Sequence, residues 1–321
     1  MFNKIKCFAL RKLECLKNFS FEEASQGRQS LRQVSRYSDL SRVILIIEPN
    51  EFHSETLPGY VKYCQELGSR VVLVWRLKNA TSGVFDRVPD TERPDCLVMN
   101  ASQMRALLRR PVAEQFKAIL LTSSRLAERA GYYGLFLNYV GGDLLQRLRL
   151  LVVEHNLPSL KPHIVSGEYN PEKLFLLSQY EDDSLSVKML NPNYFGVVQS
   201  RELQEKRVFV TIGSVTSRNR NFEQLVNAVH TLEKQGIHNF EVHVIGRGAT
   251  AKLFEGASEK FKAHGRLPFP EMYDLIESAD FFLPLLDPEN EGHRRYLSGE
   301  TTGTRQLILG FLKPPVIHQA F

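Results

Sequence analysis

The chain has 321 residues, 43% of them hydrophobic, so it can bury a large core and, by the usual domain size, form two domains. Forty-one Lys and Arg against 36 Asp and Glu give a formal net charge of +5. This mild excess favours a partner that carries phosphate groups, such as a nucleotide or an anionic membrane. It argues against nucleic acid, because the basic residues are dispersed and no recognised nucleic-acid module occurs.

The four cysteines have no CxxC spacing, so the sequence predicts free thiols, a reducing compartment and no zinc site. No apolar run approaches the roughly 18 residues that a membrane-spanning helix needs, and neither a signal peptide nor an internal repeat is found. We therefore expect a cytoplasmic protein.

The first forty residues differ from the rest of the chain. Between residues 2 and 17, apolar side chains recur at roughly helical spacing with Lys and Arg between them. Such a basic amphipathic helix either lies on an anionic bilayer, here the inner face of the plasma membrane, or packs against the protein body. Residues 18–40 are polar and indicate a connecting arm or a solvated helix.

A first α/β series begins with residues 42–47, RVILII, an apolar β-branched run typical of a central parallel strand. The loop EPNEFHSET and a helix begun by Pro58 follow it. Further strands alternating with helical segments predict right-handed βαβ units and a parallel sheet. We expect these strands at residues 70–75, 96–99, 118–121, 134–140, 149–154 and 174–178, with a helix at 103–110.

A second α/β series follows the turn-rich segment NPNYFG at residues 191–196. Its expected strands are 207–212, 240–245, 281–286 and one after Pro315, and its expected helices are 222–232, 271–278 and 301–312. The prediction is an α/β fold with two Rossmann-like domains. The expected divisions are an arm at 1–40, a first domain at 41–198 and a second at 199–321.

Three segments of the second series suit a phosphate group. Each follows a strand or opens a helix, where free backbone N–H groups and a partial positive charge point outward. Arg is also well suited to bidentate phosphate contact. Plainer interpretations remain open: an N-cap with a glycine, a solvated surface and an ordinary turn. The segments contribute Gly213, Ser214, Arg218 and Arg220; Gly246 and Arg247 of GRG; and Thr301, Thr302, Gly303 and Thr304.

The order of these features resembles the glycosyltransferases of the two-Rossmann-domain (GT-B) fold. It is most similar to the family 4-like enzymes of bacterial capsule, exopolysaccharide or lipopolysaccharide synthesis. The resemblance runs from about residue 42 to the end. It rests on IIEPNEFHSETLPGYVKYCQELG, MLNPNYFG, VTIGSVTSRNRNFEQLVNAV, VHVIGRG, LPFPEMYDLIESADFFLPLLDP and TTGTRQLILGFLKPPVI.

The resemblance implies a nucleotide-diphosphate sugar in the second domain and a glycan or lipid-linked acceptor in the first. Gly213, Ser214, Arg218 or Arg220 and the TTGT segment would hold the donor diphosphate. Glu291 and His293 of the loop DPENEGHRRY would lie near the sugar. No metal or cofactor is expected, because the helix dipole and the arginines can stabilise the developing charge and no DxD sequence occurs.

His53 is the first candidate for the group that faces the reacting centre, because an imidazole can take a proton near neutral pH. Asn50, Glu51 and Glu55 share its loop and are the expected acceptor-binding residues. A loop that simply anchors the following helix remains open. His155 and His163 are second choices.

Two departures from the family pattern keep other functions open. Glu291 and Glu300 have eight residues between them, whereas many retaining members have seven, so the spacing leaves retention or inversion open. The chain also stops soon after residues 314–318, so the second domain is expected to be short at its C-terminal end. The alternatives are a truncated, non-catalytic relative that binds nucleotide or a partner, and a nucleotide-sugar epimerase.

Overall fold

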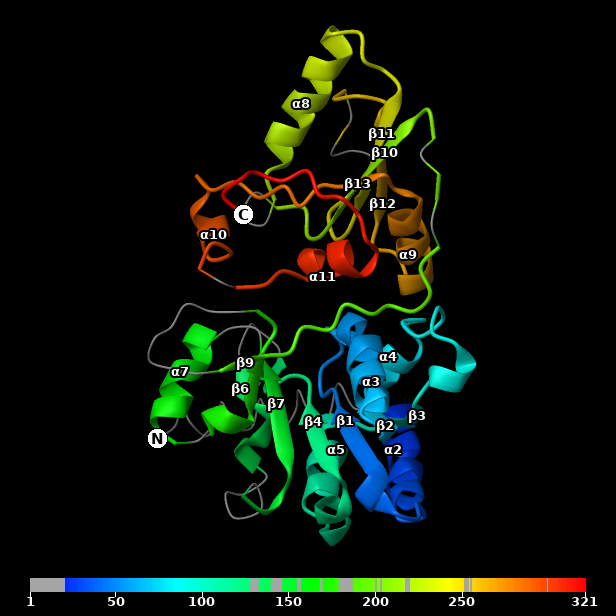
Figure 1. The fold of residues 1–321 in the computed structure, drawn as a ribbon, viewed down its shortest axis with the longest axis vertical. Helices are drawn as coiled ribbons and strands as arrows, with labels where there is room; N and C mark the ends of the chain where they lie inside the picture. Colours follow the sequence, from blue (N-terminus) through cyan, green and yellow to red (C-terminus); the bar gives the residue numbers. More distant parts are fainter. Residues whose placement is uncertain are drawn as a thin grey trace. The chain divides into compact units, whose positions relative to one another are not determined.

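The structure is a computed structural model, shown in Figure 1. The chain divides into two compact units, each described by itself. Unit 1 comprises Met1–Ser54, Cys64–Thr81 and Pro94–Val152; unit 2 comprises Glu55–Tyr63, Ser82–Arg93 and Val153–Phe321. The structure describes residues 21–127, 133–139, 146–154, 157–167, 170–178, 187–199, 201–202, 204–216, 220–250, 254, 256–298 and 300–321.

A seven-stranded sheet has the order β3-β2-β1-β4-β7-β8-β9. The central strand, β1, is buried along its whole length and pairs in parallel with both β2 and β4. The strand order reverses between β1 and β4, which makes the crevice beyond their carboxyl ends the favoured place for a ligand. The strands are β1 Val43–Ile47, β2 Arg70–Trp75, β3 Asp95–Val98, β4 Ala118–Leu121, β7 Leu150–Glu154, β8 Leu174–Leu176 and β9 Lys188–Met189.

Helices and a small antiparallel ribbon accompany this sheet. The helices are α2 Phe21–Val34, α3 Leu57–Glu66, α4 Leu77–Ala80, α5 Ala101–Leu108 and α7 Leu157–Val165, and the ribbon pairs β5 Arg125–Ala127 with β6 Tyr133–Leu135. Short 3-10 turns are η1 Leu40–Arg42, η2 Ser54–Thr56, η3 Asp90–Glu92, η4 Pro111–Gln115, η6 Phe136–Tyr139 and η7 Pro171–Lys173.

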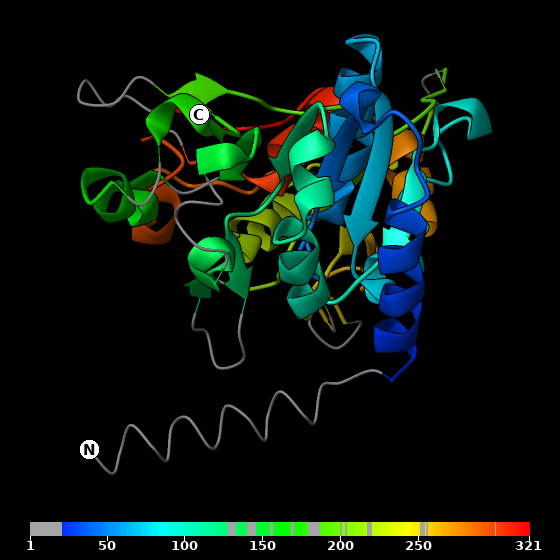
Figure 2. The same ribbon diagram turned by 90° about the horizontal axis from the view of Figure 1, so that it is seen from below.

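Helix α2 corrects the interpretation of residues 18–40 as an arm or a solvated helix. It buries Ala24, Gly27, Leu31 and Val34 and packs against β3 and α5 (Figure 2). The side-chain amide of Gln103 packs directly on Gly27, because a Cβ at this position would lie 1.9 Å from Oε1 of Gln103. This part of the predicted arm therefore belongs to the body of unit 1. Residues 1–17, with their predicted membrane contact, lie outside the described residues.

Unit 2 contains a four-stranded parallel sheet of order β12-β11-β10-β13, with helices on both faces. Tyr273, Phe282 and Phe311 centre the core on one face, and Val229, Val244 and Phe254 centre the core on the other. The elements are β10 Arg207–Ile212, β11 Phe240–Ile245, β12 Phe261–Gly265, β13 Phe281–Phe282, α8 Phe222–Lys234, α9 Phe269–Ser278, α10 Glu291–Arg294 and α11 Gly303–Gly310.

The predicted α/β chain with two Rossmann-like parallel sheets, the GT-B type of architecture, is confirmed. Three local predictions need correction. Strand β12 was not predicted. Strand β13 ends four residues earlier than expected. Residues 134–139 of the strand expected at 134–140 form the end of β6 and η6 instead. The expected last strand is a single bridge between Phe282 and Pro315. The domain boundary at 198/199 stays a prediction.

Candidate functional site

Two glycines lie at the carboxyl ends of neighbouring strands in unit 2. Gly213 follows β10 with φ 143°, and Gly246 follows β11 with φ 140°. A Cβ on Gly246 would lie 1.9 Å from the carbonyl oxygen of Gly213, so the two loops meet backbone to backbone. A Cβ on Gly213 would in turn lie 3.1 Å from a nitrogen of the Arg220 guanidinium. Both positions need glycine, since L side chains rarely adopt these φ angles.

Arg220 links the two glycine loops, which begin at Gly213 and Gly246, to helix α11. Its side chain donates to Thr304 Oγ1 at 2.7 Å and to the Ile212 carbonyl at 3.3 Å, and the residue is 6% exposed. Burial lowers the pKa of Arg220, whereas its hydrogen bond with Tyr296 raises it. The Tyr296 hydroxyl also accepts from Arg295 at 2.7 Å, so two guanidinium groups share one oxygen. The proximity of Arg295 lowers the pKa of Arg220 further.

The predicted TTGT segment opens α11. The Thr302 hydroxyl is the N-cap and accepts the Thr304 N–H at 3.0 Å, so the plain capping interpretation holds for Thr302. The Thr304 hydroxyl receives Arg220. Thr301 Oγ1 is buried and has no hydrogen-bond partner among the described residues. A Cβ on Gly303 would lie 3.8 Å from a carboxylate oxygen of Glu55, which places that carboxylate by the first turn.

The loop between β13 and α10 is organised by Asp287. Its carboxylate accepts Asn221 Nδ2 at 2.8 Å and the Glu289 N–H at 2.9 Å. Its own N–H donates to Nδ1 of His293 at 2.9 Å, which leaves the imidazole proton on Nε2 when the ring is neutral. His293 is completely buried, and within the described part of the chain its Nε2 has no partner. Burial, then nearby Arg220, lowers the pKa of His293.

The remaining predicted donor-site residues are more loosely placed. Arg247 is exposed and donates through Nε and a terminal nitrogen to Ser214 Oγ, each at 3.3 Å. Glu291 begins α10 and is also exposed. Arg218 lies outside the described residues. The structure therefore brings together Gly213, Gly246, Arg220 and Thr304, with His293 within electrostatic range of Arg220.

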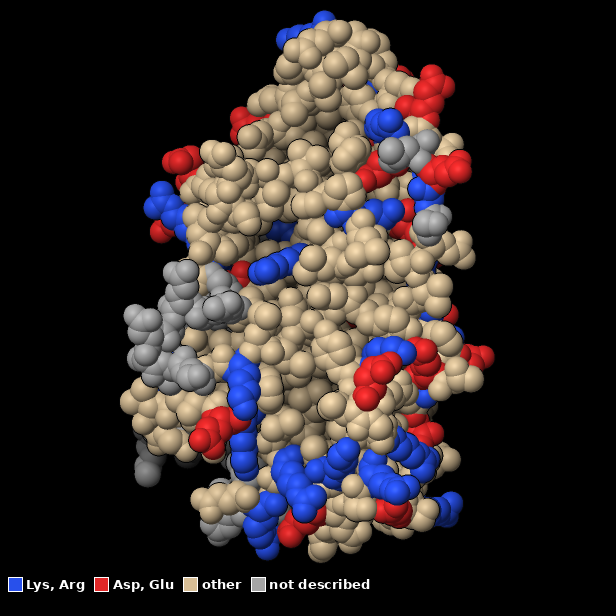
Figure 3. Space-filling view, in the orientation of Figure 1, with Lys and Arg blue, Asp and Glu red and all other residues tan. Residues whose placement is uncertain are grey.

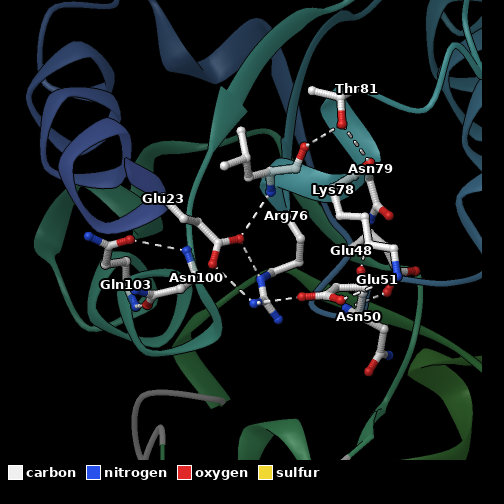
Figure 4. A network of polar contacts seen from close by, with 11 residues as sticks. Glu23, Glu48, Asn50, Glu51, Arg76, Lys78, Asn79, Thr81, Asn100 and Gln103 are labelled. Carbon is white, nitrogen blue, oxygen red and sulfur yellow. Dashed lines mark hydrogen bonds and ion pairs between the residues drawn. The ribbon is translucent and has the colours of Figure 1, made fainter. Parts of the chain in front are cut away.

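Unit 1 carries a polar network at the carboxyl ends of β1 and β2 (Figure 4). Asn50 is buried and donates through Nδ2 to the Arg125 carbonyl at 2.8 Å, while its own carbonyl accepts Asn79 Nδ2 at 2.7 Å. Glu51 pairs with Arg76 at 3.1 Å and with Lys78 at 3.6 Å. Two of the three predicted acceptor-binding residues, Asn50 and Glu51, are thus held by their own chain.

Glu23 of α2 anchors the other side of Arg76. Its two carboxylate oxygens accept Arg76 Nε at 2.7 Å and a terminal nitrogen at 3.0 Å, and one also accepts the Leu77 N–H at 3.0 Å. Burial raises the pKa of Glu23, but these bonds outweigh it and leave the pKa lowered. The network thereby fastens α2 to the edge of the sheet that also holds the loop of His53.

His53 itself occupies a strained position in that loop. Its φ of 64° lies in the left-handed region, which costs a non-glycine residue energy and is often found at functional sites. The ring is half-buried, packs edge-on against Phe52 at 4.8 Å between centroids, and lowers the pKa of Glu48 by its charge. Of the second choices, His163 lies on α7 and His155 outside the described residues.

Sequence reasoning placed Glu48 on the loop that leaves the first strand but gave it no role, and it did not single out Asp287. Glu48 directly follows the apolar run RVILII, and a carboxylate ending a buried strand was the available signal. Asp287 opens DPEN, a sequence typical of a side-chain-stabilised turn. Among the described residues, no group of three or more His, Cys, Asp or Glu is placed to hold a metal ion. None of the described helices is long and apolar enough to cross a bilayer.

The fold and this site define a class of protein. It is an α/β chain with two Rossmann-like sheets, in which glycine loops, an arginine and a helix N-terminus suited to an anion meet at the carboxyl ends of the strands of one sheet. No family model matches the chain, and neither does any curated protein. Solved structures do match; the three described here have TM-scores below 0.5, and we take no residue role from them. An alpha-glucosyltransferase in complex with UDP and a 13-mer DNA is 15% identical, covers 78% of this chain and 73% of its own, with a TM-score of 0.49.

Two further matches show the range of proteins that resemble the chain. The glycotransferase of kitacinnamycin is 11% identical over 75% of this chain and 74% of its own, with a TM-score of 0.43. A protein of Listeria monocytogenes described as a UDP-N-acetylglucosamine 2-epimerase is 12% identical over 75% and 73%, with a TM-score of 0.37. Of these three solved structures, two are described as sugar transferases and one as an epimerase.

Proposed function

We propose that the chain is a metal-independent glycosyltransferase that moves a sugar from a nucleotide-diphosphate donor to a glycan or lipid-linked acceptor in cell-surface polysaccharide synthesis. One observation carries the proposal: buried Arg220 bridges the glycine edge after β10 and the N-terminus of α11. A fixed cation, close-approach glycines and a helix N-terminus in one place suit a diphosphate.

The charge arrangement supports an anionic ligand. Arg220 and Arg295 meet at the Tyr296 hydroxyl, and their repulsion contributes to the lowered pKa of Arg220. An anion beside them relieves that repulsion. In sugar transfer, negative charge develops on the leaving diphosphate, so donors already aimed at it stabilise the transition state without reorganisation. Buried groups do this most strongly, because little water screens them.

His293 would act as a fixed hydrogen-bond donor in this site. The Asp287 N–H occupies Nδ1, and burial, followed by Arg220, lowers the pKa of the imidazole, which favours its neutral form. Nε2–H is then directed at an acceptor that the ligand supplies, either a sugar hydroxyl or a phosphate oxygen. Thr301 Oγ1, buried and without a partner among the described residues, is suited to the same ligand.

The acceptor would be activated by His53, which takes the proton from its attacking hydroxyl. Asn50 and Glu51, which are held by Arg125, Asn79, Arg76 and Lys78, would shape the loop that presents His53. Glu55 and the exposed Glu291 remain proposed contacts for the acceptor and the sugar. The division into an acceptor domain at 41–198 and a donor domain at 199–321 is part of the proposal.

Thermal unfolding with UDP, GDP, dTDP, ADP or CMP tests the donor site. A ligand at about 100 times its dissociation constant adds roughly 2.7 kcal/mol of stability, so one diphosphate should raise Tm by several degrees. Arg220→Gln should weaken binding of that diphosphate by about 10- to 150-fold, since charged hydrogen bonds contribute about 1.5–3 kcal/mol. Arg207→Gln is the matched control, because Arg207 begins β10 at its opposite end.

Failure of all five nucleotides to shift a folded sample contradicts the proposal and favours a relative that binds a partner without catalysis. Once a donor nucleotide is known, product analysis without acceptor separates transfer from epimerisation. An altered sugar still attached to its nucleotide would identify an epimerase.

The proposed location is the cytoplasmic face of an anionic membrane. Lys and Arg gather at the lower end of unit 1 in Figure 3, near the last turns of α2 and α5. Arg109, Arg110 and Arg149 are exposed at this end, and the predicted basic helix of residues 1–17 precedes α2. Flotation with phosphatidylglycerol vesicles should recover the chain at low salt, and vesicles of phosphatidylcholine alone should not. Equal recovery with both would contradict the charge argument.

A further inference from the structure

Two histidines from neighbouring strands of unit 2 contact each other. His243 lies on β11 and His264 on β12, and Nε2 of His264 is 3.0 Å from Nδ1 of His243. The rings stack, with 5.0 Å between their centroids and 18° between their planes, and both residues are half-buried. A nitrogen–nitrogen hydrogen bond of this length holds one proton, because one ring must donate and the other must accept.

Glu241 determines which ring donates. It lies two residues before His243 on the same face of β11, and its Oε1 is 3.1 Å from Nε2 of His243. This contact is not aligned as a straight hydrogen bond, so it acts mainly through charge. The carboxylate favours a proton on that nitrogen, and neutral His243 therefore offers Nδ1 as the acceptor, to which His264 donates from Nε2. The other oxygen of Glu241 accepts Lys206 Nζ at 2.5 Å.

The contact lies at an irregular point of the sheet. The register of β11 and β12 shifts after Val244, so that Ala263 and Gly265 have partners on β11 and His264 is the extra residue of a bulge. The Gly265 carbonyl, directly after His264, accepts the Gly246 N–H at 2.6 Å. The two imidazoles thus hold the bulge beside the Gly246 loop.

A proton on each ring is incompatible with this contact. When both rings are imidazolium ions, every ring nitrogen carries a hydrogen, so two N–H groups face each other and neither nitrogen can accept. The two positive charges also repel each other at this separation. Burial, then His243, lowers the pKa of His264, against the opposing charge of Glu241. The folded contact therefore excludes a proton that a separated ring would take up.

Other charged side chains of the surrounding elements are exposed or bound elsewhere. These are Lys262 and Arg266 at β12 and Glu271 of α9, which are exposed, and Asp274 and Glu277 of α9, which pair with Arg87. The protonation of the pair is therefore governed by burial, by the two rings themselves and by Glu241.

We propose that His243 and His264 form a pH-sensitive contact, which holds the bulge of β12 and the adjoining Gly246 loop while one proton lies between the rings and breaks when both rings are protonated. The contact is a property of unit 2 and does not depend on the proposed function. Its effect on diphosphate affinity, which should fall in acid as the Gly246 loop loosens, does rest on the proposed function.

Hydrogen exchange of the full-length chain tests the proposal without any ligand. Exchange rates of the Gly246 amide at pH 8 and pH 5, corrected for the intrinsic effect of pH, give its protection. Below about pH 6.5, where separated imidazoles take up protons, this protection should fall by up to about tenfold per pH unit, because opening takes up one proton. The Leu283 amide, which donates to the Val210 carbonyl in the same sheet, is the internal control and should keep its protection.

His264→Gln tests the role of the second proton. The glutamine amide can still donate to Nδ1 of His243 but cannot become charged, so the pH dependence at Gly246 should disappear. His238→Gln is the matched control: it removes an exposed histidine just before β11 and should leave that dependence unchanged.

Two results overturn the proposal. One is protection of Gly246 that changes no more than that of Leu283 between the two pH values. The other is wild-type pH dependence in a folded His264→Gln variant. If that variant does not fold, the wild-type comparison of the two amides decides alone. Because no nucleotide is added, the outcome is independent of the diphosphate-binding test.

Discussion

The loops at the carboxyl ends of the strands differ in charge between the two sheets. In unit 2, glycine backbone, arginines and a helix N-terminus meet, and the buried His293 Nε2 and Thr301 Oγ1 find no partner among the described residues. In unit 1, carboxylates dominate, and Glu23, Glu48 and Glu51 are all supplied with donors by their own chain.

The difference separates two uses of buried polar groups. A buried donor without an acceptor costs free energy and is retained where a ligand completes it. A carboxylate with a full set of donors instead holds loops in place. The unit 2 edge is therefore the stronger candidate for binding an anion, and the unit 1 edge for positioning a reactive side chain.

The largest expected effect comes from breaking the backbone contact of the unit 2 edge. Gly246→Ala places a Cβ 1.9 Å from the Gly213 carbonyl at a φ of 140° and should lower the free energy of unfolding by about 4 kcal/mol, from strain and steric overlap together. Urea unfolding measures it. Gly236→Ala is the control: its φ is 76° and nothing lies within 4 Å, so only backbone strain of about 1 kcal/mol remains. Equal losses in the two variants would show that the loops do not meet.

The polar groups of the unit 1 edge should make the stability of the chain depend on pH. The folded-state pKa of Glu48 is raised from 4.5 to about 7, so the folded chain keeps a proton that the unfolded chain has lost. The resulting stability is fully present below about pH 4.5 and is lost as pH rises through 7. The wild type should lose up to about 3 kcal/mol relative to Glu48→Gln over that interval. Urea unfolding at pH 5 and pH 8 measures the difference, and parallel losses in both proteins would contradict it.

The smallest effect compares two adjacent threonines of the TTGT segment. Thr302→Ala removes the cap of α11 and should cost about 1 kcal/mol of stability. Thr301→Val removes a hydroxyl that has no described partner, so stability should stay the same or rise, while nucleotide-diphosphate affinity falls. Differential scanning fluorimetry with and without the diphosphate reports both changes. A destabilised Thr301→Val with unchanged affinity would assign that hydroxyl to the fold.

Much of the fold follows from local patterns. The strands at 70–75, 118–121, 207–212 and 240–245 were predicted with their observed bounds, because apolar β-branched runs suit central parallel strands. Strand β12 escaped prediction, since FKAHG at the sheet edge has little apolar patterning. The strand beginning at Phe281 ends early. Leu285 has φ 54°, which sequence periodicity does not reveal.

The sequence predicted only those parts of the site that lie at the carboxyl ends of predicted strands. Gly213 and Gly246 were expected near each other because carboxyl ends of parallel strands share an edge. The contact of Arg220 with Thr304 joins residues 84 positions apart, and that of Glu48 with Thr122 joins residues 74 apart. No periodic pattern encodes such pairs. Their partners depend on tertiary packing, which also decides whether a polar side chain is buried.

Helix α2 has a consequence for synthesis of the chain on the ribosome. It is made early, yet the Ala24 carbonyl accepts Gln103 Nε2, and the Leu31 carbonyl accepts a nitrogen of Arg110, each 79 residues later. At about 5–20 residues per second, its apolar face waits roughly 4–16 s for these partners. During that interval α2 is open to chaperones or to a neighbouring nascent chain, so translation speed through residues 24–110 should influence the yield of folded protein.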